Sequence, residues 1–172
     1  EIDTLIKMNF FNKSLFAVHG VAMDEEQAKA FGALIWCPVS NYFLLNATAD
    51  IEKLKSKTSI LFGTDSTLTA GWNLWEHLRL ARKTKMMNDR ELFETLTKTP
   101  SSTWKQNNNG IIAANKNADI VIAKAENRKG FDAFYSLKPE DLQWVLHKGE
   151  IRLFDEEIKA QLSANDFSIK EF

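Results

Sequence analysis

The stretch TSILFGTDS at residues 58–66 decides the fold, because a short apolar run ends there in a glycine and a carboxylate. Two earlier stretches, SLFAVHG at 14–20 and ALIWCPVSN at 33–41, repeat the pattern of an apolar run followed by polar residues. Short apolar runs without alternation are typical of strands that are buried on both faces. The sequence therefore predicts three buried strands, at 14–18, 33–37 and 58–62.

Helical segments separate these strands. Asp24 stands three residues before Gln27, a capping-box spacing that predicts a short helix reaching Phe31. Residues 49–55 carry apolar side chains at helical spacing. Parallel strands need long crossover connections, whereas antiparallel neighbours do not, so alternating strands and helices favour parallel pairing. The fold class predicted for this part is α/β, with a parallel sheet or barrel.

The pattern changes in the second half of the chain. An amphipathic helix is expected at 72–85, followed by another that begins at 89–96. After Pro100 the sequence predicts a turn at 107–110. Three short strands are predicted to follow it, at 111–112, 118–122 and 143–147. The spacing around Lys148-Gly149 predicts a hairpin turn. We therefore expect a β-rich tail.

Composition excludes several classes of function. The chain has 172 residues, 44% of them hydrophobic, and 22 basic residues against 23 acidic ones. It thus has no basic field to hold nucleic acid or an anionic membrane surface.

Its one cysteine cannot close an intrachain disulfide, which makes a cytoplasmic location the default expectation. The sequence opens at Glu1 without a methionine, so we expect a piece of a longer protein, with a trimmed N-terminus as the alternative.

Polar residues follow each predicted strand. His19 ends the first, residues 38–41 follow the second, and Asp65 follows the third. Sites in barrels and open α/β sheets form beyond the carboxyl ends of the strands, where an imidazole and a carboxylate bind a divalent metal or exchange protons. Each residue also has a structural interpretation: His19 as a hydrogen-bonded structural histidine, and Asp65 as the cap of the next helix.

The residues at the three strand ends resemble successive blocks of the amidohydrolase superfamily. The segments FAVHG at 16–20, WCPVSN at 36–41 and FGTDS at 62–66 are similar to the ends of its sixth, seventh and eighth barrel strands. The branch is the one that contains cytosine and guanine deaminases and chlorotriazine hydrolases. The segments at 110–112 and 118–122 resemble its return to a small β-sandwich beside the barrel.

The resemblance implies a fold and its boundaries. Residues 1–105 would form the last three βα units of a TIM (β/α)₈ barrel, which is incomplete in this chain. Residues 106–172 would form a small β-rich, sandwich-like domain with a C-terminal helix or tail.

The resemblance also implies roles for individual residues. Asp65 matches the family's aspartate that ligates the catalytic metal and shuttles a proton from the metal-bound water. His19 matches a histidine that orients the substrate and water in mononuclear members and ligates a second metal in binuclear ones. Asn41 either fixes the loop after its strand or touches substrate. His77 and His147 match no motif and are expected to be surface or packing residues.

The implied function is hydrolysis of a non-peptide carbon–nitrogen bond with metal-activated water. The implied cofactor is a divalent metal, zinc first, with iron or manganese as alternatives. The family's His-x-His pair is not found in this sequence, so the isolated chain is predicted to be inactive. The expected partners are a small-molecule substrate, the missing N-terminal part of the barrel and further copies of the chain, with neither nucleic acid nor membrane. The alternative is a catalytically silent amidohydrolase-like scaffold or binding module.

Two further expectations concern side chains that attract attention. Cys37 lies at the end of a buried strand, where a thiol behaves as a small hydrophobe, so a cysteine nucleophile is not expected. Trp72 and Trp75 are expected to lie in the core rather than to stack on a ligand, although the loop at 67–71 is a candidate pocket lining.

Overall fold

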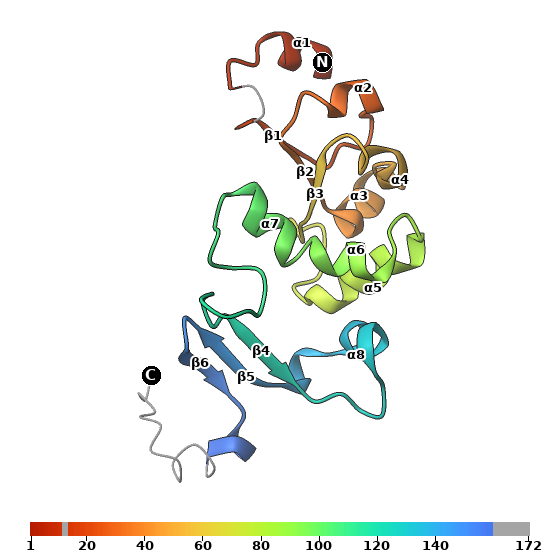
Figure 1. Ribbon diagram of the computed structural model, residues 1–172. Helices are drawn as coiled ribbons and strands as arrows, with labels where there is room; N and C mark the ends of the chain where they lie inside the picture. Colours follow the sequence, from red (N-terminus) through yellow and green to blue (C-terminus); the bar gives the residue numbers. More distant parts are fainter. Residues whose placement is uncertain (12–13, 160–172) are drawn as a thin grey trace. The chain divides into compact units, whose positions relative to one another are not determined.

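The computed structural model describes residues 1–11 and 14–159, and the chain divides into two compact units, 1–107 and 108–172. Each unit is described separately (Figure 1). The first contains three strands and most of the helices. Its elements are α1 (Ile2–Lys7), β1 (Phe16–Val18), α2 (Glu25–Ala28), β2 (Ala33–Trp36), α3 (Pro38–Leu45), α4 (Ile51–Leu54), β3 (Ser59–Phe62), α5 (Leu74–Thr84), α6 (Asp89–Glu94) and α7 (Lys98–Thr103).

The strands of the first unit form a parallel sheet in the order β1-β2-β3 (Figure 1). Ala17 pairs with Leu34, and Ile35 pairs with Leu61. Ala33 and Leu34, which point to opposite faces of β2, are both fully buried, as expected for a central strand covered on both faces. The predicted strands and their parallel pairing are therefore confirmed, each strand being slightly shorter than its apolar run.

Helix ends follow local sequence chemistry. Asp24 and Gln27 form the predicted capping box at the start of α2. The sequence did not predict α3, which begins directly after β2 with Pro38 in its first turn, where the missing N–H costs nothing. Nor did it predict α7, in which Pro100 also falls in the first turn.

The helix expected at 72–85 begins later than predicted. Asn73 caps α5 by accepting a hydrogen bond from the backbone N–H of Trp75, so Trp72 lies outside the helix. Trp72 is 73% exposed, and the expectation that it lies in the core was wrong. The buried face of α5 is made instead by His77, Leu78 and Ala81.

The second unit contains β4 (Ile120–Ala123), α8 (Gly130–Ser136), the short 3-10 helix η2 (Pro139–Asp141), β5 (Leu142–His147) and β6 (Glu150–Phe154). Its three strands pair antiparallel in the order β4-β5-β6 (Figure 1). Lys148 and Gly149 both have positive φ, 52° and 82°, as a two-residue hairpin turn requires, which confirms the predicted turn.

Two expectations for this unit had other outcomes. Ile111 and Ile112 form no strand and are 47% and 81% exposed, because two apolar residues without a neighbouring strand have no ladder to join. The expected C-terminal helix or tail falls largely beyond residue 159, outside the described residues. Nowhere in the described ranges is a helix both long and apolar enough to cross a membrane.

Candidate functional site

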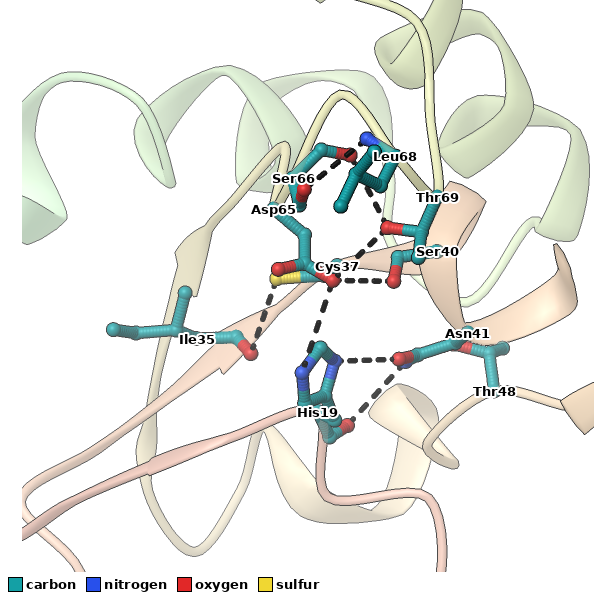
Figure 2. Close-up of polar contacts among 10 residues, drawn as sticks. All are labelled: His19, Ile35, Cys37, Ser40, Asn41, Thr48, Asp65, Ser66, Leu68 and Thr69. Carbon is teal, nitrogen blue, oxygen red and sulfur yellow. Dashed lines mark hydrogen bonds and ion pairs between the residues drawn. The ribbon is translucent and has the colours of Figure 1, made fainter. Parts of the chain in front are cut away.

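The carboxyl ends of β1, β2 and β3 bring three polar segments together (Figure 2). His19 follows β1 directly, Asn41 lies near the start of α3, and Asp65 follows β3. His19 Nε2 lies 3.9 Å from Asp65 Oδ2, and the two side chains are 40% and 28% exposed. The two principal residues singled out from the sequence therefore lie side by side at the edge where parallel strands place their sites.

The backbone at both residues is unusual. His19 has φ +69° and Asp65 has φ +60°, a left-handed conformation that only a few per cent of non-glycine residues adopt. The backbone N–H of His19 donates to the carbonyl of Ile35 at 3.0 Å, which fixes the turn after β1. Such strained positions cluster at functional sites, where the surrounding structure holds them in place.

Gly63 is required by the close approach of the strands beneath Asp65. A Cβ built there would lie 2.7 Å from Cys37 Sγ and 2.8 Å from Ile35 Cγ2. Its N–H donates to the carbonyl of Trp36 at 2.9 Å. The glycine therefore lets the chain stay against β2 until it turns to present Asp65.

Asp65 is held by hydroxyl donors. The Ser40 hydroxyl donates a short hydrogen bond to Asp65 Oδ2, and the Thr69 hydroxyl lies 3.4 Å from the same oxygen. The Ser40 bond, followed by the nearby His19, lowers the pKa of the Asp65 carboxyl. Asp65 is therefore an ionised carboxylate near neutral pH. The helix-cap interpretation was wrong, because the following helix begins only at Leu74 and is capped by Asn73.

Asn41 is 2% exposed and contacts His19 through its side chain. Its Oδ1 lies 2.8 Å from His19 Nδ1, and its Nδ2 lies 3.1 Å from Thr48 Oγ1 (Figure 2). Nδ2 is also 3.5 Å from the carbonyl oxygen of His19. Asn41 therefore binds protein groups on both ends of its amide.

Sequence reasoning did not single out Ser40. It lies within the segment at 38–41 that was noticed, one residue before Asn41, and it is fully buried. The available signal was its position near the carboxyl end of a parallel strand. Which side chain of that segment meets Asp65 depends on the turn of α3, which the sequence did not predict.

The cysteine and the two other histidines do not take part in this cluster. Burial, and to a smaller extent the charge of Asp65, raises the pKa of the Cys37 thiol to about 11, which agrees with the prediction that it is no nucleophile. His77 is buried and its Nε2 lies 2.6 Å from the carbonyl oxygen of Gly71, a packing role. His147 is half exposed and lies 2.9 Å from Asp119 on the second unit's surface.

The residues present fit part of a metal site. Asp65 Oδ2 and His19 Nε2 are oxygen and nitrogen donors of the kinds that zinc prefers. Catalytic zinc generally takes three protein ligands, and no group of three or more His, Cys, Asp or Glu side chains suited to a metal stands together within residues 1–11 and 14–159. Asp65 and His19 are thus two donors of suitable kinds, and the described residues place no third such donor beside them.

A cavity of about 790 Å³ lies elsewhere in the first unit. Its lining includes Gly32, Ser59 and Glu91, so it opens at the amino ends of β2 and β3. His19 and Asp65 follow the carboxyl ends, which makes this cavity separate from the candidate site.

Solved structures define the class of fold. The fold of the chain is similar to part of the fold of solved deaminases and a triazine hydrolase, and the chain spans only about two fifths of the length of those structures. At sequence identities below 20%, this likeness establishes the fold alone. No protein-family model and no curated protein sequence matches the chain.

The particular structures include two deaminases and a chlorohydrolase. An adenosine deaminase from Xanthomonas campestris with bound zinc has a TM-score of 0.76 at 18% identity, over 95% of this chain and 43% of its own. Escherichia coli guanine deaminase has a TM-score of 0.76 at 17% identity, over 90% and 42% respectively. A mutant atrazine chlorohydrolase from Arthrobacter aurescens, complexed with zinc and atraton, has a TM-score of 0.73 at 18% identity, over 94% and 43%.

Proposed function

We propose that this chain is part of a metal-dependent hydrolase that acts on a non-peptide carbon–nitrogen bond of a small molecule, such as an aminated heterocycle. One observation carries the proposal: an ionised carboxylate and an imidazole lie 3.9 Å apart at the carboxyl ends of parallel strands. The fold is shared with deaminases and a chlorohydrolase, which supports the reaction class.

The chemistry divides between the chain and the metal. A bound divalent metal, zinc in the first instance, supplies water activated as a nucleophile at neutral pH. Asp65 would ligate the metal through its carboxylate, which the lowered pKa keeps ionised, and would be the group that accepts the proton. His19 would orient substrate and water, or would ligate a second metal. Asn41 holds His19 rather than substrate.

The fold supports an assignment of the parts. We take residues 1–105 as the last three βα units of a (β/α)₈ barrel and residues 106–172 as its small β-rich companion domain. The other ligands and most substrate contacts then belong to the remaining part of the barrel, which is the first partner of this chain.

Hydrolysis assays test the proposal on the product of the complete reading frame that contains this chain, supplied with zinc and offered adenosine or guanine. We expect release of ammonia, and a loss of about 10²-fold or more in the Asp65→Asn variant, which has no carboxylate to accept the proton. Asp119→Asn is the matched control, because Asp119 belongs to the second unit, where it lies 2.9 Å from His147 Nδ1. Equal rates for both variants would contradict the role of Asp65, and the chain alone should be inactive.

A second candidate function is a catalytically silent scaffold of the same fold. The observation in its favour is that the described residues bring together two metal donors and not three. The coding sequence upstream of Glu1 discriminates the two. A predicted strand that ends in His-x-His supports the enzyme, and a reading frame that starts at or near Glu1 supports the scaffold.

A further inference from the structure

A chain of polar side chains connects the core to His19. The indole Nε1 of Trp36 donates to Thr48 Oγ1 at 2.7 Å, and Asn41 Nδ2 donates to the same oxygen at 3.1 Å. Asn41 Oδ1 then meets His19 Nδ1 at 2.8 Å (Figure 2). These residues come from β2, α3, the segment after α3 and the end of β1, so the hydrogen bonds tie four segments of the first unit together.

The direction of these hydrogen bonds is determined by its ends. An indole N–H can only donate, so Thr48 Oγ1 accepts from Trp36; a hydroxyl can also donate, so the orientation of the Asn41 amide is decided at its other contact. The carbonyl oxygen of His19 can only accept, and it lies 3.5 Å from the amide nitrogen of Asn41. The reversed amide would place two acceptors against each other there. Asn41 therefore presents Oδ1 to the imidazole, and Nδ1 of His19 must carry the proton that fills this bond.

Burial makes this arrangement rigid. Trp36 is fully buried and Asn41 is 2% exposed. A buried amide that loses a hydrogen-bond partner bears its full desolvation cost, because no water replaces the partner. Asn41 therefore stays in one orientation, and it holds both the ring angle and the protonated nitrogen of His19.

The neighbouring carboxylate favours the opposite tautomer. Asp65 near Nε2 would attract a proton onto that nitrogen, but the separation of 3.9 Å is too long for a hydrogen bond, whereas Asn41 Oδ1 is at 2.8 Å. The shorter contact, with Asn41, therefore determines that the proton lies on Nδ1. The neutral imidazole then directs an Nε2 lone pair towards Asp65, so two unprotonated donor atoms face the same space.

We propose that Asn41, held by Thr48 and Trp36, is a positioning residue that fixes His19 as its Nδ1–H tautomer with the Nε2 lone pair beside Asp65. The tautomer is a property of the chain itself, and only its purpose rests on the proposed function. A histidine so fixed is ready to accept a proton or bind a cation at Nε2 without first rearranging.

Nitrogen NMR tests this on the whole 172-residue chain labelled with ¹⁵N at its three histidines. At alkaline pH, long-range ¹H–¹⁵N correlations distinguish the protonated ring nitrogen from the bare one. We expect His19 as Nδ1–H. His77 is the internal reference, because its bond to the Gly71 carbonyl requires the opposite Nε2–H tautomer.

Two variants distinguish the positioning role of Asn41 from a general effect on folding. Asn41→Leu keeps the volume but removes the acceptor, so His19 should lose its Nδ1–H majority while His77 stays unchanged. Asn41→Asp keeps an acceptor at the same place and should retain the Nδ1–H form. His19 found as Nε2–H in the unaltered chain, or still as Nδ1–H in Asn41→Leu, would overturn the proposal. If the complete protein hydrolyses its substrate while His19 is the Nε2–H tautomer, the positioning role of Asn41 is rejected and the proposed function stands. If hydrolysis is absent while His19 is the Nδ1–H tautomer, the proposed function is rejected and the positioning role stands.

Discussion

Ser40 lowers the pKa of the Asp65 carboxyl more than any other residue does. Its buried hydroxyl donates to Asp65 Oδ2 and is the largest cause of the lowered pKa of that carboxyl. The Ser40→Ala variant should therefore raise the pKa of Asp65 towards the ordinary value of about 3.9. A ¹³C NMR titration of the carboxyl measures this. Ser56→Ala is the control, because Ser56 bonds only the carbonyl of Lys53 on an exposed turn, and an equal shift in both variants would contradict the assignment.

Cys37 gives a second test at this scale. Because the pKa of its buried thiol is raised to about 11, the thiol is protonated at pH 8 and shielded from reagents. We expect no reaction with a disulfide reagent in the folded chain and one reacting thiol per chain after denaturation, since the chain has one cysteine. Rapid labelling of the folded chain would show that this strand end is open.

The sequence located His19 and Asp65 because each follows an apolar run that a parallel sheet must bury. It did not locate Ser40, since a serine in a polar segment carries no pattern of its own. Trp72 was misplaced for a related reason: its apolar side chain fits the helical spacing, but the cap at Asn73 starts the helix after it. A hydrogen bond between distant segments decided the role of Ser40, and a local cap decided where α5 begins.

At the scale of elements, α6 depends on a capping box between Asn88 and Glu91. The Asn88 side chain accepts from the N–H of Glu91 at 2.9 Å, and Glu91 accepts from the N–H of Asn88 at 2.8 Å. Asn88→Ala should lower the free energy of unfolding by about 1 kcal/mol, and Asn88→Ser, which can still cap, by much less. Urea denaturation measures both, and equal stabilities would mean that the cap contributes nothing.

Glu91 also adds a dependence on pH. Lys55 donates to it at 2.8 Å and lowers its pKa, with help from the Asn88 N–H. The folded pKa is below the unfolded one, so the stabilisation is present above the unfolded value of about 4.3 and is lost as the pH falls through the folded value. In Glu91→Gln the unfolding midpoint should therefore change less as the pH falls below the unfolded value of about 4.3. An unaltered acid-side slope would contradict this.

The elements themselves were predictable where burial governs them. The strands of the first sheet follow apolar runs, and the turn at Lys148-Gly149 follows from its required positive φ. The helix α3 was not predictable in this way. Its apolar residues lie on more than one side, because Phe43, Leu44 and Leu45 follow one another and are all largely exposed.

At the scale of the molecule, the first unit leaves apolar side chains uncovered. The outer strand β1 pairs only with β2 among the described strands, and its Val18 is 51% exposed. The three apolar side chains at residues 43–45 are more exposed still. Unpaired strand edges and apolar patches drive association. We therefore expect the isolated chain to self-associate in analytical ultracentrifugation. A clean monomer over the whole concentration range would contradict this expectation.

The central claim is that Asp65 and His19 form one side of a metal site whose other ligands lie outside this chain. The most direct test measures the zinc that remains bound after exhaustive dialysis. The product of the complete reading frame should retain stoichiometric zinc, its Asp65→Ala/His19→Ala variant should lose most of it, and the 172-residue chain alone should retain none. Stoichiometric zinc on the isolated chain, or undiminished zinc in the double variant, would contradict the claim.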